Sequence, residues 1–408
     1  MLPETKTILR GSISYLASGI LSGITPFIVS LLVSRALGKE GLGFLSVVFT
    51  LVLMGVLLSE LGLNPVILRD FADPKRVRAL PLRAILTFRF AAALFVAALV
   101  AALMMLAGVP SLLIPGTSAL IIMRSTAGVL ENYLKARLLH RIYLGVTFLR
   151  AVLQIAVVYV LLHNGSGLGT VLLGLAIVDL LTTLVFGAFS VHELRSAAAN
   201  LFSHQTDLRS LFAQSLPFML IGLLTFINER ADILLLAAMR GAEEVGLYSA
   251  ADRFLIVVNL IDSALLATTL PTLTTLLRTK RYGSVMKQLF VIVGGISLVG
   301  TAVLFFAAPV LIGVTFRFTE SVRLLQVLAL AIPAILANRL LRSVLYSLKR
   351  ERAISVLLAL TSVGGVVMNI LFIPLYGAMA AALVTVGGEY LLAGLYYRLY
   401  VAETHRAP

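Results

Sequence analysis

Long apolar runs recur along the whole chain, and each is long enough to cross a lipid bilayer. A hydrocarbon core about 30 Å thick needs about 20 apolar residues in helical conformation. Membrane β-strands would instead appear as alternating segments of about ten residues. We therefore expect an all-α integral membrane protein with about twelve transmembrane helices, at residues 13–34, 43–61, 82–107, 112–130, 144–162, 170–189, 211–238, 246–276, 285–308, 322–345, 354–371 and 378–397.

The composition agrees with a chain that lies almost entirely in lipid. Of its 408 residues, 60% are hydrophobic and 13% are charged, whereas soluble domains average about 45–50% and about 25%. The connectors between the apolar runs are short. We therefore expect no attached soluble domain.

The basic residues indicate how the chain is oriented. Lys and Arg concentrate in alternate connectors, and the connectors between hold only Arg35, Lys39, Arg240, Arg317 and Arg323. Positive charge is retained on the cytoplasmic side of membranes, which predicts that both termini are cytoplasmic. The net charge of +14 thus reflects topology, since a nucleic-acid surface would cluster its basic residues on one face.

A short internal repeat divides the chain in two. Residues 38–46 and 241–249 are identical at four positions, two of them glycines, and the offset of 203 is about half of the 408-residue length. Both copies interrupt long apolar runs. Duplicated helical bundles in membranes are mostly transporters with a site at the interface of the halves. We expect two six-helix lobes, residues 1–203 and 204–408, with the glycines permitting a turn in each copy.

Residue patterns typical of enzymes are not found. The chain has no cysteine and five histidines, and no two histidines have the helical spacing of a metal-binding pair. The glycines do not form a phosphate-binding loop of the type that powers ATP-driven transporters. We therefore expect no enzymatic activity, no metal and no cofactor.

Charged side chains inside the apolar runs are the best candidates for function. Each costs at least about 2.5–3.5 kcal/mol at the centre of a membrane helix, so such residues usually face a cavity or each other. At a rise of about 1.5 Å per residue, Arg124, Asp179 and Glu389 lie near the midplane. The two acids occupy almost equivalent places in the two halves, and both are candidate ion carriers.

The hairpin around the second repeat carries four more charges. Asp232 and Arg253 should lie at similar depth, as should Arg230 and Asp252, so cross-hairpin ion pairs are expected; substrate contact is the alternative. Asp262 has no obvious partner and is a third candidate ion carrier. Asn228, on the helix face of Asp232, is a candidate substrate contact.

Further arginines lie toward the expected cytoplasmic ends of the spans, namely Arg89, Arg150, Arg339 and Arg342. Arg339 and Arg342 are three residues apart and share one helix face, a spacing suited to gripping a phosphate or pyrophosphate. Snorkelling to lipid head groups is the alternative for these side chains.

Several segments resemble the polysaccharide (O-antigen type) flippases of the multidrug/oligosaccharidyl-lipid/polysaccharide (MOP) superfamily. The segment 228–249, with Asp232 followed by an apolar run and the second repeat, is similar to a signature of that family. Weaker similarities occur in order along the rest of the chain, at 35–43, 61–63, Pro271, 346–350, Asn369 and 376–378. The order and spacing of these segments are more specific than any one of them.

The resemblance implies two six-helix lobes of MATE-like fold around a cavity that opens alternately to each side of the cytoplasmic (inner) membrane. It implies a substrate in which an oligosaccharide is joined through pyrophosphate to undecaprenol, for surface polysaccharide such as lipopolysaccharide O-antigen. Cavity arginines commonly bind the pyrophosphate in this family, which indicates Arg124, Arg339 and Arg342 here, followed by Arg89 and Arg150. Implied partners are membrane lipids and the polysaccharide polymerase and chain-length machinery.

Two features depart from that pattern. The two extra C-terminal helices of the lipid II flippase relatives are not found, which argues against a peptidoglycan precursor as substrate. Arg253 has no place in the pattern and receives no role from it.

The main alternative function is a MATE-like cation-coupled antiporter of drugs or metabolites, in which Asp179, Glu389 or Asp262 would carry the ion. A third possible function, a membrane-embedded glycosyltransferase, would need a large outer loop. The outer connectors of this chain are short, which argues against that function.

Overall fold

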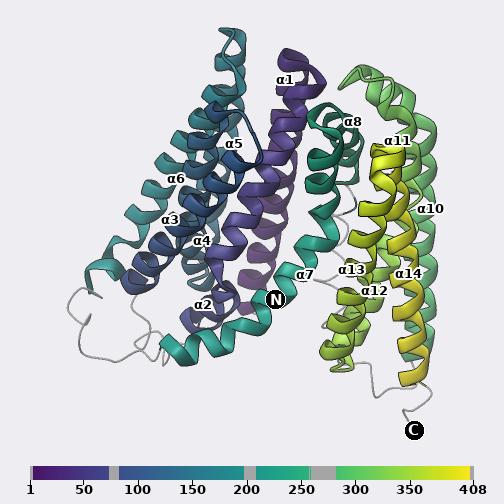
Figure 1. Ribbon diagram of the computed structural model, residues 1–408. Coiled ribbons are helices and arrows are strands. Elements are labelled where there is room, and N and C mark those ends of the chain that lie inside the picture. The colour runs from purple at the N-terminus through teal and green to yellow at the C-terminus, as the bar shows by residue number, and fades with distance from the viewer. Residues whose placement is uncertain (1–2, 73–81, 197–207, 257, 259–281, 405–408) are drawn as a thin grey trace. The chain divides into compact units, whose positions relative to one another are not determined.

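The computed structural model describes residues 3–72, 82–196, 208–256, 258 and 282–404 (Figure 1). Within these ranges the chain forms helices and turns, without a strand. The prediction of an all-α fold is therefore confirmed.

Nine helical segments of the described chain are long and apolar enough to cross a membrane. The first, Ala17–Glu60, contains two of the expected spans, because α1 (Pro3–Glu60) runs through a non-helical kink at Gly38. The seventh expected span corresponds to α7 (Leu208–Arg240), which is not among the nine. Most of the eighth lies outside the described residues.

The chain divides into two compact units. The first comprises Met1–Leu37 and Val48–Leu223, and the second comprises Gly38–Val47 and Leu224–Pro408. The first copy of the repeat thus belongs to the second unit. The lobe boundary expected between residues 203 and 204 lies outside the described residues, so the lobes at 1–203 and 204–408 stay a prediction.

The first unit is a helical bundle whose core joins five elements. These are α2 (Leu63–Ala72), α3 (Leu82–Leu106), α4 (Ile114–Ala136), α5 (His140–His163) and α6 (Leu168–Ser196), with the one-turn helix η2 (Ser111–Leu113) before α4. Tyr133, Tyr143 and Phe186 are buried at the centre of this core. Since α4 packs against both α3 and α6, two of its polar residues contact those helices: Ser125 contacts Arg89, and Arg124 contacts Asp179.

The second unit contains the remaining helices. They are α8 (Ala242–Asp252), the short η4 (Arg253–Leu255), α10 (Tyr282–Val314), α11 (Ser321–Ala329), α12 (Ile332–Ser347), α13 (Glu351–Tyr376) and α14 (Ala378–Thr404). Leu341, Leu358 and Tyr396 are buried where α12, α13 and α14 meet. The turn between α13 and α14 requires Gly377, whose φ of 58° favours a residue without a side chain.

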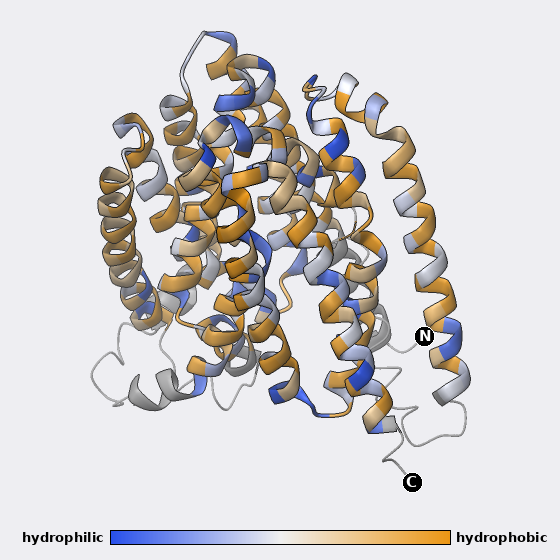
Figure 2. Cartoon of the chain, turned by 45° about the vertical axis from the view of Figure 1, so that its right-hand side comes forward, coloured by the Kyte–Doolittle hydropathy of each residue, from blue (hydrophilic) through white to orange (hydrophobic). Residues whose placement is uncertain are grey.

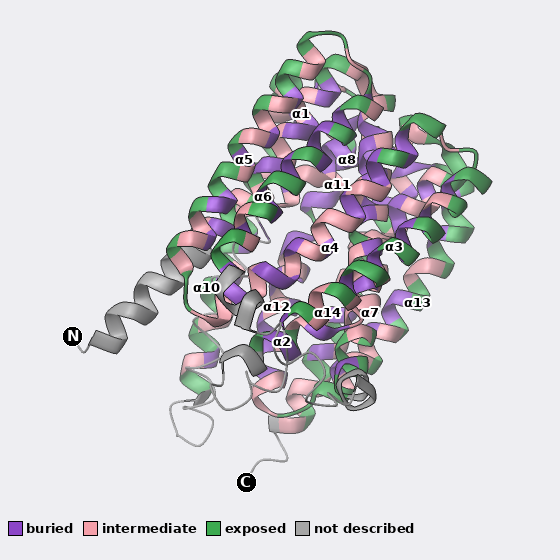
Figure 3. Ribbon diagram, turned by 90° about the vertical axis from the view of Figure 1, so that its left-hand side faces the viewer, coloured by how far each residue is buried: buried purple, intermediate pink, exposed green. Residues whose placement is uncertain are grey.

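The outer faces of the helices are apolar. Hydrophobic residues dominate most helices in Figure 2, and exposed positions run along the helices in Figure 3. Many of the large hydrophobic side chains are exposed. On α10 the exposed positions recur at helical spacing and reach 79% exposure at Phe306; they include Ile292, Ile296, Val299, Val303 and Val310. A stripe of this length without a charge is typical of a surface that faces lipid acyl chains.

The two copies of the repeat pack against each other within the second unit. An added Cβ at Gly43 would lie 1.7 Å from the carbonyl oxygen of Ala242, and one at Gly246 would lie 1.9 Å from that of Lys39. Lys39 and Ala242 are equivalent positions of the repeat, as are Gly43 and Gly246, so the contact is reciprocal. Small residues permit such close approach of helix backbones.

The glycines of the repeat therefore have two different structural roles. Gly38 and Gly241 have positive φ angles of 69° and 86° and make the turns, as the sequence predicts. Gly43 and Gly246 lie in helices and provide room for the neighbouring backbone. The Lys39 amine forms an ion pair with Glu243 at 2.5 Å across the same contact.

Candidate functional site

A polar cavity of about 310 Å³ lies within the first unit. This volume is roughly ten times the 30 Å³ that one water molecule occupies in the liquid, so the cavity can hold a small polar group with its water. Its lining contains two arginines, two acids and a glutamine from α4, α5 and α6, namely Arg124, Glu131, Arg150, Gln154 and Asp179.

Arg124 and Asp179 form an ion pair in this cavity. The Arg124 Nε–H donates to Asp179 Oδ2 at 2.8 Å, and Gln154 Nε2 donates to Asp179 Oδ1 at 2.8 Å. The side chain of Asp179 is 1% exposed and that of Arg124 is 32% exposed. The guanidinium also lies 5.5 Å from the centre of the Phe49 ring, a cation–π contact. The carboxylate is thus buried while the guanidinium faces the cavity.

Arg150 has an acidic partner as well. Its Nη1 donates to Glu131 Oε1 at 2.9 Å, and the amine of Lys135 lies 3.9 Å from Glu131 Oε2. The two arginines and two acids of the lining cancel in formal charge. A ligand that carries negative charge must therefore compete with side-chain carboxylates for either arginine.

Arg89 lies behind the wall of this cavity. Its side chain is 1% exposed, and its Nη2 is 3.8 Å from the position that a Cβ of Gly128, a lining residue, would take. Nε donates to Ser125 Oγ at 3.1 Å, and Nη2 lies 3.8 Å from Glu60 Oε1. Burial at this depth keeps Arg89 from direct ligand contact in this structure, so we assign it a structural role.

Substituting Arg89 by methionine should destabilise the protein by about 3 kcal/mol, because Glu60 would remain in the membrane without its counter-charge. The thermal unfolding midpoint of the purified protein should fall accordingly. The double variant Arg89→Met with Glu60→Gln should recover much of the loss, since it removes both charges. An unchanged midpoint for Arg89→Met alone would contradict the structural role.

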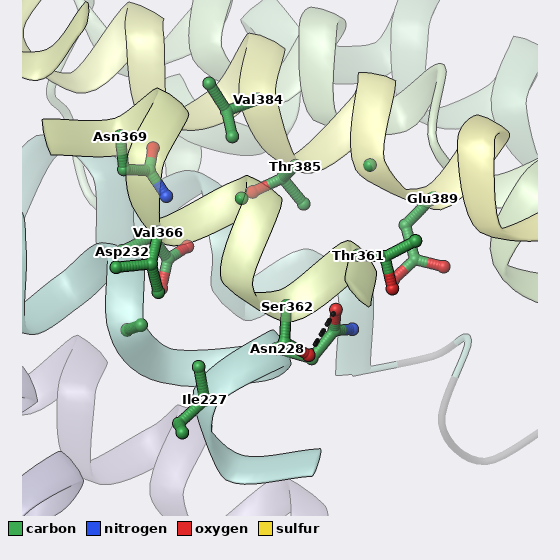
Figure 4. Close-up of a pocket in the computed structure, with 13 residues that line it drawn as sticks. Ile227, Asn228, Asp232, Thr361, Ser362, Val366, Asn369, Val384, Thr385 and Glu389 are labelled. Carbon is green, nitrogen blue, oxygen red and sulfur yellow. Dashed lines mark hydrogen bonds between the residues drawn. The ribbon is translucent and has the colours of Figure 1, made fainter. Parts of the chain in front are cut away.

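The second unit contains a smaller polar cavity of about 40 Å³ (Figure 4). This volume suits a water molecule or a small ion. The described residues of its lining come from α7, α13 and α14 and include two carboxylates but no basic side chain. The polar lining residues are Asn228, Asp232, Thr361, Ser362, Asn369, Thr385 and Glu389.

Asp232 is held by an aromatic hydroxyl. The Tyr248 hydroxyl donates to Asp232 Oδ2, and the backbone N–H of Ile233 donates to Oδ1 at 2.8 Å. The same hydroxyl lies 3.4 Å from Thr385 Oγ1. Asn369 Oδ1 is buried without a hydrogen-bond partner among the described residues and belongs to the same cavity lining.

Glu389 lies at the other end of this cavity in Figure 4. Asn338 Nδ2 donates to Glu389 Oε2 at 2.7 Å and to its backbone carbonyl at 2.9 Å. Asn228 Oδ1 is 3.5 Å from the Ser362 hydroxyl. Arg339 Nη2 lies 3.4 Å from Glu229 Oε1, so it too has an acidic partner. Arg339 and Arg342 both lie on α12, partly exposed.

Depth along the α7–α8 hairpin predicts one of its two expected ion pairs correctly, Arg230 with Asp252, and the other, Asp232 with Arg253, wrongly. Arg230 Nη1 lies 3.1 Å from Asp252 Oδ2. Asp232 accepts a hydrogen bond from Tyr248, and among the described residues it forms no ion pair with Arg253. Within the described ranges, Arg253 Nε is buried without a hydrogen-bond partner. Asp262 lies outside the described residues.

The two cavities occupy equivalent places in the two halves. Asp179 and Glu389 stand at the same distance from the first residues of α6 and α14, Leu168 and Ala378. Arg150 and Thr361 are likewise equidistant from the starts of α5 and α13. The same scaffold therefore presents arginines in the first unit and amides, hydroxyls and carboxylates in the second.

Several residues that contact the lining acids are not recognisable from the sequence alone. Gln154 is a single polar residue within an apolar run, Asn338 directly precedes Arg339, and Tyr248 belongs to the second copy of the repeat. Polarity inside a span is the only signal for the first two, and it does not identify the carboxylate that each one contacts. The role of Tyr248 depends on a side chain 16 residues away.

Solved transporter structures share this fold over nearly the full chain. An inward-facing multidrug resistance MATE family transporter of the MOP superfamily has a TM-score of 0.73 at 15% identity, covering 97% of this chain and 96% of that one. The eukaryotic MATE transporter AtDTX14 has a TM-score of 0.65 at 16% identity, with coverage of 98% and 95%. A MOP superfamily transporter from Pyrococcus furiosus gives 0.61 at 13%, covering 97% and 96%.

Fold and membrane spans together define a multi-pass membrane protein with the fold of these transporters. The profile of the polysaccharide biosynthesis protein family matches residues 8–277. The chain belongs to this family, as the sequence resemblance predicts. No curated protein sequence matches the chain.

Proposed function

We propose that this protein is a flippase that moves undecaprenyl-pyrophosphate-linked oligosaccharide units across the cytoplasmic membrane by alternating access. Family membership supports a role in polysaccharide biosynthesis. The observation that carries the proposal is Arg124, an arginine inside a membrane helix whose guanidinium faces a polar cavity.

The chemistry of such a substrate explains why a protein is needed. Each buried hydroxyl without a hydrogen-bond partner costs on the order of a few kcal/mol, and an isolated charge costs far more. Sugars and pyrophosphate therefore cannot cross about 30 Å of hydrocarbon unaided. A polar path inside the protein would carry the head group while the prenyl tail remains in lipid.

The cavity of the first unit supplies the contacts that a pyrophosphate needs. Arg124 and Arg150 both line it, and arginine is well suited to bind phosphate oxygens with two parallel N–H groups. Arg339 and Arg342 offer further guanidinium groups on α12. The amides and hydroxyls of the second unit are suited to neutral ligands, water or an ion.

Deleting the gene tests the proposal in the cell. Lipid-linked repeat units should accumulate on the cytoplasmic face, and surface polysaccharide should be lost. Normal surface polysaccharide without accumulation would contradict it. Complementation with the intact gene should restore export, which separates loss of this protein from effects on the polymerase and chain-length machinery.

Glu389 is our candidate for ion coupling. Asp179 accepts a hydrogen bond from the positively charged Arg124 and another from Gln154, whereas Glu389 accepts its hydrogen bond from the neutral Asn338. We expect Glu389→Gln to remove the dependence of transport on a cation or proton gradient, measured in proteoliposomes with an imposed gradient. The matched variant Asp179→Asn should retain that dependence. Loss of the dependence in Asp179→Asn alone would reverse the assignment.

A cation-coupled antiporter of drugs or metabolites is the second candidate. The fold shared with multidrug MATE transporters and the carboxylate-lined cavity of the second unit favour it. Reconstituted protein that exports cationic dyes but does not move a lipid-linked oligosaccharide would support this alternative and exclude the flippase.

A further inference from the structure

The arginine that faces the larger cavity is bound to a buried acid. Arg124 donates to Asp179 through Nε, and within the described part of the chain only this nitrogen of the guanidinium forms a hydrogen bond. The two terminal nitrogens of a guanidinium carry four N–H groups. These groups are therefore available for a ligand while the carboxylate remains in place.

The Asp179 carboxylate is held in place, so a ligand cannot move it aside by rotating its side chain. Its side chain is 1% exposed, and both of its oxygens accept hydrogen bonds, one from Arg124 and one from Gln154. A phosphate on the terminal nitrogens of Arg124 would lie beside this fixed negative charge. Like charges at such short range repel strongly in a membrane interior, where the dielectric constant is low.

We propose that Asp179 is a competitor of the ligand for Arg124: its fixed negative charge lowers the affinity of Arg124 for phosphate oxygens and thereby permits release of the ligand. This inference rests on the proposed function and names the regulation of the same cavity. A conduction or transport site must bind its ligand well enough to admit it and weakly enough to let it leave. An arginine without a counter-charge in a buried site would hold a pyrophosphate too tightly for turnover.

The other charged groups around Asp179 do not replace it in this role. Arg150 and Glu131 on the neighbouring helices form their own ion pair at 2.9 Å, and Lys135 lies 3.9 Å from Glu131. Arg89 lies behind the cavity wall. The residues of α1 that line the cavity are Leu21, Ser22, Thr25, Pro26 and Val56, which carry no charge.

The test compares pyrophosphate affinity with transport rate. Asp179→Asn removes the charge and keeps an acceptor for Arg124, so the purified full-length variant should bind inorganic pyrophosphate at least about tenfold more tightly than the wild type. It should also transport a lipid-linked oligosaccharide more slowly in proteoliposomes. Tighter binding together with slower transport is the result that a merely structural residue would not give.

Two matched variants separate charge from position. Asp179→Glu keeps the charge, and Gln154→Leu removes the second hydrogen bond without changing the charge; neither should tighten pyrophosphate binding as Asp179→Asn does. If Asp179→Asn binds pyrophosphate more weakly than the wild type or equally well, the competitor role is wrong. The role is also wrong if Gln154→Leu tightens binding as much as Asp179→Asn does.

The outcome for the flippase itself is measured separately. If neither the wild type nor Asp179→Asn binds pyrophosphate, Arg124 is not an anion site and the inference fails. Transport of the lipid-linked oligosaccharide by the wild-type protein would still support the proposed function in that case. Binding that follows the expected order with no transport by either protein would support the lowered affinity alone and reject both the role in release and the flippase.

Discussion

Replacing Gly246 with alanine should destabilise the protein by about 3 kcal/mol, a large effect for one methyl group. The added Cβ would lie 1.9 Å from the carbonyl oxygen of Lys39 and 2.7 Å from its carbonyl carbon. Both atoms are backbone, so no side-chain rotation relieves the clash. The segment 38–47 would have to move away from α8.

The equivalent change at Gly43 should have a similar effect, because its added Cβ would lie 1.7 Å from the Ala242 carbonyl oxygen. Thermal unfolding of the purified variants measures both losses. Gly294→Ala is the matched control, since its Cβ would meet no described atom within 4 Å and alanine favours helices by about 0.5–1 kcal/mol. Equal midpoints for Gly246→Ala and Gly294→Ala would show that the two copies are not in close contact.

Arg124→Ala should reduce transport at least about tenfold, since a hydrogen bond to a charged group contributes about 1.5–3 kcal/mol. The substitution removes the guanidinium that faces the larger cavity and leaves Asp179 without its basic partner. Transport of a lipid-linked oligosaccharide in proteoliposomes is the measurement. Arg124→Lys should have intermediate activity, because lysine keeps the charge and loses the planar pair of donors.

Loss of activity must be separated from loss of folding. The double variant Arg124→Ala with Asp179→Asn removes both charges of the pair, so it should unfold close to the wild-type temperature and remain inactive. Arg323→Ala, at an exposed position on α11, should transport at the wild-type rate. Full transport by a folded Arg124→Ala protein would remove Arg124 from the substrate site.

Much of the fold is predictable because lipid imposes one strong rule. A chain in hydrocarbon must satisfy its own backbone hydrogen bonds, so long apolar runs become helices. The kink at Gly38 and the turn at Gly241 follow from glycines in the repeat. The close packing of Gly43 and Gly246 does not, because a helical glycine with a backbone neighbour and one that faces lipid have the same sequence pattern.

The site is less predictable because depth along a helix gives no information about direction. Depth places Arg124 and Asp179 together near the midplane, but their contact depends on how α4 and α6 pack. Depth also pairs Asp232 with Arg253, whereas in the structure Asp232 accepts a hydrogen bond from Tyr248. Rotation of each helix about its axis is set by tertiary packing, which a single sequence does not reveal.

The most direct test of the account is transport by the purified protein alone. Liposomes would contain a fluorescent undecaprenyl-pyrophosphate-linked oligosaccharide in both leaflets, and a membrane-impermeant reagent would modify the outer sugars. With the protein present, the modified fraction should rise from about one half toward completion as inner molecules reach the outer leaflet. A modified fraction that stays at the level of protein-free liposomes, with folded protein in the membrane, would contradict the flippase.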